Sequence, residues 1–441
     1  MLKVPMKISG LVIIAILLVI PLIWIPGLLH HSAVAVISQL IGIWALITMA
    51  MGQILATRFK WVESVFGGLD QVYVLHKWLG IAAVALILLH DTIDADIDGL
   101  PGNRMFEEIG DTLGEISLYG ILILVVITVA TFIPYHLWRW THRFIGVFFV
   151  LGALHYLMII KPFSNLDPLG LYVGSICIAG ILAFVWRSLP AAFKPSHPYT
   201  ISNVEKFNSA TAISLKPTKK GLKHRAGQFI NVSIADDESH PFTVSCAPQD
   251  DRTLRVSIGV LGDHTNQLRK SISVDQTVRV EGPHGRFFPS KSNSRVWVAA
   301  GIGITPFLAW AEAMKPDDPK TELVYCIKNR ATATHLPELE QIVSNRENLS
   351  LTVWESQSKG RLTTPALTDL VSEIATGSVA FCGPVAMRKS LQNDLSKAGL
   401  PPKQFHYEDF EFRTGIGLEA LSQWVWSRMQ KARAAKRLHD A

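Results

Sequence analysis

The sequence predicts a multi-domain membrane protein: a six-helix transmembrane bundle, then an antiparallel β-barrel and an α/β domain. Three observations lead to this fold class. Residues 1–190 carry only 21 charged side chains, whereas residues 191–441 carry 57. The apolar half contains six long hydrophobic segments. The charged half begins with short β-rich runs and continues with strands that alternate with helical stretches.

Composition excludes several other classes. The chain of 441 residues is 49% hydrophobic, has a mean hydropathy of +0.27 and is 18% charged, against about 25% charged residues in ordinary soluble domains. A wholly soluble or disordered protein is therefore not expected. The four cysteines form no C-x-x-C pair, which argues against a disulfide scaffold or a zinc ribbon and favours reduced thiols. The net charge of +6 gives no reason to expect nucleic acid, since basic loops and a basic tail account for it.

The six hydrophobic segments are each long enough to span a bilayer, which takes roughly 20 mostly apolar residues. The first follows Lys3 and Lys7 as a signal peptide would, but its long apolar run and the lack of an A-x-A site predict an uncleaved helix. The predicted spans are Ile8–Pro26, Ala33–Ala56, Val72–Leu89, Ile116–Pro134, Phe144–Ile160 and Leu169–Trp186.

The distribution of lysine and arginine predicts the orientation. With the N-terminus inside, eight of the ten basic residues of this half are cytoplasmic, and only Arg104 and Lys161 lie outside. The segment Asp91–Asp111, with seven acidic residues and one arginine, is then an external loop. An even number of crossings leaves the charged half in the cytoplasm, so we expect a multi-pass protein of the cell membrane with both termini inside.

Histidines at membrane depth are the chemical anomaly of the apolar half, because polar groups there are costly and usually functional. His76 and His90 lie fourteen residues apart on the third predicted helix, and His142 and His155 lie thirteen apart on the fifth. These two helices run in the same direction, so His76 matches His142 in depth and His90 matches His155. Neutral imidazole is a common axial ligand of haem iron, and the pattern predicts two b-type haems, one near each face. The alternative is four interfacial or hydrogen-bonding histidines.

The spacing of thirteen places one demand on the fifth helix. At about 100° per residue, fourteen steps return nearly to the same helix face, whereas thirteen steps miss it by about 140°. The sequence therefore predicts that the fifth helix bends, or that the two haems are rotated relative to each other about the membrane normal.

The charged half reads as two domains. After a proline-containing linker at 189–198, six short strands predict a barrel at 199–290. From residue 291 the pattern becomes strand, glycine turn and helix, which predicts a doubly wound α/β domain at 291–412. The predicted strands are Tyr199–Val204, Ala210–Leu215, Gln228–Ser233, Phe242–Ala247, Leu254–Val260, Thr277–Gly282, Val296–Ala300, Glu322–Ile327, Ser350–Trp354 and Ser378–Cys382.

The glycine turn Gly301-Ile302-Gly303-Ile304-Thr305-Pro306 follows a strand and opens a helix. Glycines permit close approach of a pyrophosphate, and the free N–H groups of the helix N-terminus face the anion. A plain tight turn is the alternative for this motif alone. Arg330 follows the next strand, where an arginine can hold a 2′-phosphate, although it is equally well explained as a loop arginine.

Three motifs in order make a resemblance specific. His240-Pro241-Phe242-Thr243-Val244-Ser245 resembles the FAD-binding motif of the ferric reductase and NADPH oxidase superfamily. Gly301–Pro306 and Cys382-Gly383-Pro384 resemble that superfamily's nicotinamide-nucleotide motifs, and the histidine spacings resemble its two-haem membrane domain. The similarity covers about residues 30–412 and is closest to bacterial members. Gly282-Pro283-His284-Gly285-Arg286-Phe287 resembles a further motif of the superfamily but carries His284 where tyrosine is usual.

The resemblance implies a 1–188 ferric-reductase-like haem domain, an FAD-binding barrel and an NAD(P)H-binding α/β domain. Cys382 would lie near the nicotinamide, unless it is simply a buried small residue. A terminal aromatic would cover the flavin, and the basic extension 413–441 would lie on the inner membrane face or in solvent. The implied FAD-binding residues are His240, Pro241, Phe242, Thr243, Val244, Ser245, Thr265, Phe410 and Phe412. The implied NAD(P)H-binding residues are Gly301, Ile302, Gly303, Thr305, Pro306, Arg330, Cys382, Gly383 and Pro384.

The predicted function is transmembrane electron transfer from cytoplasmic NADPH or NADH, through FAD and two haems, to an external acceptor. The acidic segment Asp91–Asp111 favours ferric iron, because it attracts ferric species and repels superoxide. One alternative is an NADPH oxidase that reduces O2 to superoxide. Another is a haem-bearing membrane subunit that feeds a periplasmic acceptor protein. A haem-binding channel or transporter is a further class, against which the FAD and nucleotide motifs argue.

Overall fold

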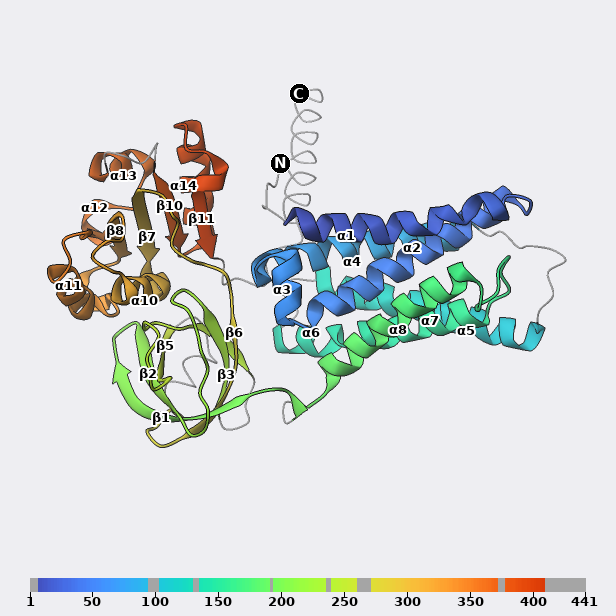
Figure 1. Cartoon of the computed structure of the whole chain (residues 1–441), viewed down its shortest axis with the longest axis horizontal. Coiled ribbons are helices and arrows are strands. Elements are labelled where there is room, and N and C mark those ends of the chain that lie inside the picture. Colours follow the sequence, from blue (N-terminus) through green and yellow to red (C-terminus); the bar gives the residue numbers. More distant parts are fainter. Residues whose placement is uncertain are drawn as a thin grey trace, which may run out of the picture. The chain divides into compact units, whose positions relative to one another are not determined.

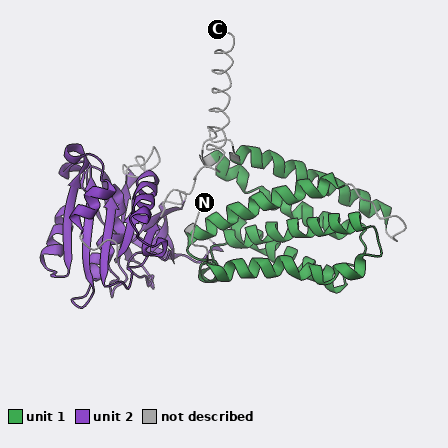
Figure 2. Ribbon diagram, turned by 90° about the horizontal axis from the view of Figure 1, so that it is seen from above, with its two compact units in different colours: residues 1–192, 412–441 green, residues 193–411 purple. Residues whose placement is uncertain are grey.

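The computed structural model describes residues 7–93, 103–129, 135–190, 193–234, 239–259, 271–371 and 377–408. The chain divides into two compact units, residues 1–192 with 412–441 and residues 193–411 (Figure 2). Unit 1 contains long apolar helices. Unit 2 contains a six-stranded antiparallel sheet and a five-stranded parallel sheet. The predicted fold class is therefore confirmed (Figure 1).

Six helical segments in the described ranges are long and apolar enough to cross a bilayer, as predicted, which makes this a multi-pass membrane protein. The second and sixth spans are the continuous helices α2 (Ala33–Ala56) and α8 (Pro168–Ser188), and the third is α4 (Leu69–Thr92). The first span, Ile8–Leu28, is α1 (Ile8–Val19) followed by two 3₁₀ turns, because Pro21 and Pro26 cannot donate to an α-helical ladder. A short helix that the sequence analysis did not predict, α3 (Lys60–Phe66), joins the second and third spans.

The prediction for the fourth span was wrong at its start. Helix α5 covers Arg104–Val129, so it begins twelve residues before the predicted Ile116 and includes the end of the supposed loop Asp91–Asp111. Asn103 opens the helix, because its side-chain oxygen accepts the N–H of Met105 and its carbonyl accepts the N–H of Glu107. Acidic residues are compatible with the first turns of a helix, so polarity alone does not mark where a helix ends.

The fifth span is broken, in line with the first of the two options that the histidine spacing leaves open. It consists of α6 (Tyr135–His142) and α7 (Ile145–Met158), joined by a turn at Arg143–Phe144. The predicted bend therefore lies directly after His142.

The bundle is held together by close helix contacts at glycines. Helix α2 packs against α4 and α8, and α5 packs against α7 (Figure 1). A Cβ atom on Gly120 would lie 2.1 Å from the Phe148 ring, and one on Gly180 would lie 2.8 Å from the Phe149 ring. Small residues at helix interfaces are the main means of close packing in a bilayer, since apolar burial gives little driving force there.

The antiparallel sheet of unit 2 is an almost closed barrel with strand order β4-β3-β6-β1-β2-β5. A bridge between Val244 and Val256 joins the two edges. The predicted strand Phe242–Ala247 is shorter and earlier than expected, because the chain pairs with β3 only through Thr243. The strands are β1 (His197–Lys206), β2 (Ala210–Pro217), β3 (Phe229–Ile234), β4 (His240–Thr243), β5 (Leu254–Gly259) and β6 (Thr277–His284).

The second sheet is parallel throughout, with strand order β11-β10-β7-β8-β9. The chain starts at the centre, winds to one edge and returns to wind to the other, which is the doubly wound order. The strands are β7 (Ser294–Ala300), β8 (Lys320–Ile327), β9 (Leu349–Glu355), β10 (Ser378–Cys382) and β11 (Phe405–Glu408), the last not predicted. The helices are α10 (Thr305–Ala313), α11 (Leu336–Ser344), α12 (Ser356–Lys359), α13 (Thr364–Leu370) and α14 (Val385–Lys397).

An aromatic cluster anchors helix α10 against this sheet. Phe307 is fully buried, and its ring centroid lies 5.1 Å from Trp310, 5.8 Å from Trp297 and 5.8 Å from Phe287. Aromatic pairs at these separations contribute beyond simple burial. The cluster therefore fixes the helix that follows the glycine turn.

We expect Phe307→Ala to cost about 3–5 kcal/mol of stability in unit 2, because it empties the centre of this cluster. The measurement is the temperature at which the purified full-length protein releases its flavin. Val274→Ala, which truncates a half-exposed side chain on the barrel, is the control and should leave that temperature unchanged. Equal midpoints for the two variants would contradict the anchoring role of Phe307.

Candidate functional site

The four predicted histidines form two pairs inside unit 1. The ring centroids of His76 and His142 lie 6.2 Å apart, and those of His90 and His155 lie 6.4 Å apart. Two metal–imidazole bonds of about 2 Å each, together with the ring radii, separate the centroids of two imidazoles on one ion by about 6 Å. Both separations therefore suit two axial ligands of a single iron.

Each histidine also has its other ring nitrogen next to an oxygen acceptor. The Nδ1 atoms of His76, His90 and His155 lie 3.0, 2.9 and 2.9 Å from the backbone oxygens of Gly52, Ser38 and Gly110. A carbonyl only accepts, so each Nδ1 carries the proton and each Nε2 keeps a free lone pair. Metal-bound histidines characteristically donate their second N–H in this way. For His142 the neighbour is the Thr128 hydroxyl, at 3.5 Å.

The acceptors come from two helices with regular spacing. Ser38 and Gly52 are fourteen residues apart on α2, matching the spacing of His90 and His76 on α4. Gly110 and Thr128 are eighteen apart on α5, which is five full turns. Helix α2 thus presents one face to both histidines of α4. In the same way, α5 presents one face to the histidines of α6 and α7.

The FAD motif lies on β4 and the residues that follow it. Thr243 and Ser245 alternate with Val244, which is fully buried in the barrel core, so their side chains point away from that core. The Thr243 hydroxyl is buried and has no hydrogen-bond partner among the described residues, which fits a polar ligand atom at this position. Phe242 and His240 are partly exposed, as is Pro241 between them.

Ser245 has other partners. Its hydroxyl lies 3.2 Å from both the Arg255 backbone oxygen and the Ser257 hydroxyl. The prediction that Ser245 contacts the flavin stays a prediction. Thr265, Phe410 and Phe412, also assigned to FAD, lie outside the described residues, as does the basic extension 413–441.

The glycine turn and Cys382-Gly383-Pro384 meet at the switch point of the parallel sheet. They follow the adjacent strands β7 and β10, and ligands of doubly wound sheets bind at such a point. A Cβ atom on Gly303 would lie 2.2 Å from the Cys382 backbone oxygen, so only glycine permits this approach. Thr305 and Pro306 open α10, whose N-terminus follows the turn directly. The Ile302 side chain lies within 3.1 Å of the Cβ position of Gly259, which places the turn against the end of barrel strand β5.

Cys382 and Arg330 lie at or just after the ends of parallel strands, and they differ in how far they are exposed to solvent. Cys382 is the last residue of β10 and is fully buried. Arg330 is half-exposed after β8 and pairs with Glu340 at 2.8 Å. Glu408, which the sequence analysis missed, is buried at the end of β11, with its Oε1 3.4 Å from the Cβ position of Gly285. No sequence motif marked Glu408, because its strand was not predicted.

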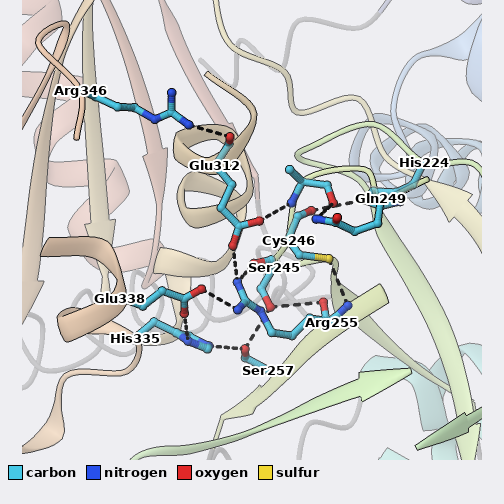
Figure 3. Close-up of polar contacts among 11 residues, drawn as sticks. His224, Ser245, Cys246, Gln249, Arg255, Ser257, Glu312, His335, Glu338 and Arg346 are labelled. Atoms are coloured by element: carbon cyan, nitrogen blue, oxygen red, sulfur yellow. Dashed lines mark hydrogen bonds and ion pairs between the residues drawn. The ribbon is translucent and has the colours of Figure 1, made fainter. Parts of the chain in front are cut away.

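A second feature missed by sequence reasoning is a polar network between the barrel and the α/β domain (Figure 3). Arg255, on β5, donates to Glu312 of α10 at 2.7 Å and to Glu338 of α11 at 2.6 Å. It also donates to the Ser245 backbone oxygen at 2.6 Å. Glu312 in turn accepts the N–H of Ala247 at 2.7 Å. The network therefore links the strand that follows the FAD motif to the helix that follows the glycine turn.

His335 extends this network. Its Nδ1 donates to Glu338 at 2.9 Å, and its Nε2 lies 2.8 Å from the Ser257 hydroxyl. Burial opposes ionisation of Glu338, but the hydrogen bond from His335 and the charge of Arg255 outweigh burial and lower its pKa to about 2. Burial raises the pKa of the neighbouring Cys246 thiol to about 11, so Cys246 is not a reactive thiolate at neutral pH.

Comparison with known proteins agrees with this arrangement. Residues 41–153 match the family model of the ferric reductase like transmembrane component, residues 208–288 an FAD-binding domain, and residues 297–393 an oxidoreductase NAD-binding domain. These matches define a multi-pass membrane flavoprotein with a nicotinamide-nucleotide domain. The three matches follow one another in the order that the motifs predict, and the resemblance drawn from the motifs is confirmed.

Individual relatives are distant. Ferric reduction oxidase 7, chloroplastic, of Arabidopsis thaliana is 27% identical over 350 residues, 69% of this chain and 45% of that protein. Flavohemoprotein A of Dictyostelium discoideum is 28% identical over 158 residues, 34% of this chain and 40% of its own length. The heme-dependent oxidative N-demethylase beta subunit of Ectopseudomonas mendocina is 25% identical over 190 residues, 42% and 59% of the two chains. The chain thus spans about half the length of these relatives.

Gly303→Ala should raise the KM for the nicotinamide nucleotide by about tenfold or more, which corresponds to about 1.4 kcal/mol. The added methyl would collide with the Cys382 backbone and push the two loops of the switch point apart. Steady-state kinetics with a flavin-level acceptor measure the effect. Gly174→Ala is the control, since nothing lies within 4 Å of that Cβ position and Gly174 lies within helix α8, outside unit 2. An unchanged KM in Gly303→Ala would contradict the phosphate-loop assignment.

Glu338 should make unit 2 sensitive to acid. Its pKa in the folded protein is about 2, below its ordinary value of 4.5, so its stabilising contribution is complete above pH 4.5 and is lost as pH falls toward 2. Glu338→Gln should lower the flavin-release temperature by several degrees at pH 7, and the difference from the wild type should shrink between pH 4.5 and 2. Glu340→Gln, which removes the half-exposed partner of Arg330, is the control and should behave as the wild type. A pH-independent difference would show that the Glu338 charge is not involved.

Proposed function

We propose that this protein is a transmembrane oxidoreductase that transfers electrons from cytoplasmic NADPH or NADH to an acceptor on the other face of the cell membrane. One observation carries the proposal. Two histidine pairs lie at separate positions along the bundle, their ring centroids 6.2 and 6.4 Å apart. In each pair the ring nitrogens not needed for a metal lie next to an oxygen acceptor. Such an arrangement suits electron carriers on both sides of the hydrophobic layer.

The residues fit two b-type haems. His76 and His142 would hold the inner group, and His90 and His155 the outer one, each through Nε2. The sequence has no C-x-x-C-H motif for covalent attachment, which favours b-type haem. When bound, FAD accepts a hydride and releases electrons singly, and the haem irons relay them. The chain orients the imidazoles, keeps them neutral and excludes water around them.

The nucleotide and the flavin would meet in unit 2. Gly301, Ile302, Gly303, Thr305 and Pro306 supply the loop and helix N-terminus for the pyrophosphate. Cys382, Gly383 and Pro384 border the same point from β10 and leave room for the nicotinamide. Thr243 would offer its unpartnered hydroxyl to the flavin, with His240, Pro241, Phe242, Val244 and Ser245 around it. Arg330 would meet a 2′-phosphate with the N–H groups that its Nη1 contact with Glu340 leaves available.

Charge supports the proposed orientation. Arg187 on α8 lies within electrostatic reach of Arg58, Arg139 and Arg143, so basic residues from several helices gather at the end of the bundle near His76 and His142. Positive charge concentrates on the cytoplasmic side of membrane proteins. The His76 and His142 pair would therefore be the inner site, the one that receives electrons from the flavin, and both termini would lie in the cytoplasm.

The acceptor we propose is ferric iron. Asp91 at the end of α4 and Glu107, Glu108 and Asp111 in the first turns of α5 place negative charge at the outer end, which attracts cationic ferric species. The name of the Arabidopsis relative, a ferric reduction oxidase, agrees with this choice. One NAD(P)H would supply two electrons and release one proton, and two ferric ions would become ferrous. Dioxygen or a periplasmic acceptor protein are the outcomes that the experiment must separate from iron.

The test is anaerobic reduction of the purified, FAD-supplemented protein by NADPH or NADH, followed by visible spectroscopy. We expect two low-spin haems that both become reduced. Addition of ferric chelate or of air then distinguishes iron reduction from superoxide formation, with superoxide dismutase as a control. Slow turnover that recovers with a periplasmic fraction would indicate a partner protein. Absence of haem, or haem that neither nucleotide reduces, would refute the proposal.

His90→Ala should remove the outer haem, halve the haem content and abolish external reduction, because one of the two residues that would hold this haem is lost. Transfer from NAD(P)H to FAD should persist, since unit 2 is unchanged. The pyridine haemochrome content and flavin reduction rate measure both effects. His31→Ala, at the same end of the bundle but outside the two pairs, is the control and should retain both haems. Retention of two haems in His90→Ala would contradict the assignment of His90 as a haem ligand.

A further inference from the structure

Helix α2 contributes the backbone oxygen of one residue to each histidine of α4, and those two residues differ. Gly52 faces His76, with its carbonyl oxygen 3.0 Å from Nδ1. Ser38 faces His90, with its carbonyl oxygen 2.9 Å from Nδ1. The two acceptor residues are fourteen positions apart on α2, and the two histidines are fourteen positions apart on α4, so the two contacts are equivalent in backbone geometry. The difference between them is the side chain at position 38.

The Ser38 hydroxyl adds a second oxygen acceptor at His90. Ser38 is buried, and its Oγ lies 3.0 Å from His90 Nδ1 and 3.2 Å from the carbonyl oxygen of Ile93. Since a carbonyl only accepts, the hydroxyl donates its proton to the carbonyl of Ile93, which lies nearer than that of His90 at 3.5 Å, and turns a lone pair to the N–H of His90. His90 therefore donates to both oxygens of Ser38, whereas His76 has the single oxygen of Gly52.

We propose that Ser38 is a positioning residue that strengthens His90 as an electron donor and so lowers the reduction potential of the outer haem. This inference rests on the proposed function, in which His90 and His155 hold that haem. An acceptor on the second N–H of an imidazole increases the basicity of the ligating nitrogen, and a more basic ligand stabilises the oxidised metal. Ser38 also ties the ring to the end of α4 through Ile93, which restricts rotation of the imidazole.

The structure also has room for the opposite substitution, which would add a hydroxyl beside His76. A Cβ atom on Gly52 would lie 3.8 Å from His76 Nδ1 and 3.9 Å from its Cε1, which is ordinary van der Waals contact. Glycines near the outer pair are tighter, since a Cβ atom on Gly114 would lie 2.7 Å from His155 Nδ1. Gly52→Ser can therefore place a hydroxyl beside His76, while Ser38→Ala removes the one beside His90 and keeps its carbonyl acceptor.

The experiment is a potentiometric titration of the intact, purified protein, followed by visible and electron paramagnetic resonance spectroscopy. His90→Ala identifies which midpoint belongs to the outer haem. We expect Ser38→Ala to raise the outer midpoint and leave the inner one unchanged, and Ser38→Thr to restore it. Gly52→Ser should lower the inner midpoint only. Ser117→Ala is the control, because this buried hydroxyl donates to the Phe148 carbonyl at 2.7 Å, and it should move neither midpoint.

The outcomes separate the inference from the proposed function. Two haems with unchanged midpoints in Ser38→Ala would overturn the role of Ser38 and leave the haem assignment intact. If Ser38→Ala fails to fold, the inner midpoint in Gly52→Ser decides: a fall supports the inference, and no shift overturns it. A wild-type protein without two low-spin haems would overturn the proposed function and the inference together.

Discussion

The arrangement of the helices in unit 1 depends on one requirement. A neutral imidazole inside a bilayer must donate its N–H to an acceptor of the protein, because no water is available there. An unsatisfied polar group in an apolar medium costs several kcal/mol, so each histidine needs an acceptor on a neighbouring helix. At His76, His90 and His155 that acceptor is a backbone carbonyl, which has a second lone pair beyond its helical hydrogen bond. Reaching a carbonyl requires close helices, and this accounts for small residues at positions 38, 52 and 110.

The same requirement explains the break in the fifth span. A straight helix would turn His142 away from the face that presents His155. The turn at Arg143–Phe144 ends α6 directly after His142 and separates it from α7, which carries His155. The cost of the break is limited, because the N–H groups of Phe144 and Gly146 still bond to the carbonyls three residues earlier, those of Thr141 and Arg143. Pairing of the rings, rather than helix continuity, determines the path of the chain here.

Unit 2 is subject to a different constraint, because its FAD-binding barrel and its NAD-binding α/β domain must be held in one arrangement. Parallel strands β7 and β10 bring two glycine-containing loops together, and the barrel contributes the end of β5 to the same region through Gly259. The Arg255 network then connects β5 to α10 and α11 through partly buried charges. Such ion pairs contribute little net stability compared with apolar contacts. In this network, however, each hydrogen bond of Arg255 reaches a different segment: the Ser245 backbone, α10 and α11. Their value here lies in fixing where the FAD motif stands relative to the glycine turn.

The parts of this molecule that were predictable from sequence are those carried by local patterns. Apolar length gives the six spans, and the glycine turn gives the start of α10, because each depends on neighbouring residues. The start of α5 was missed because acidic residues at Glu107 and Glu108 look like a loop but also suit a helix N-terminus. Contacts such as Arg255 with Glu312 and Glu338, or Ser38 with His90, join residues more than fifty positions apart and have no local signature. The histidines were identifiable because burial of imidazole in lipid is unusual, whereas a serine or a glycine on the facing helix is ordinary. Candidate metal ligands can therefore be identified from polar residues in apolar segments. The residues that accept their second N–H are identified only from the packing of the helices.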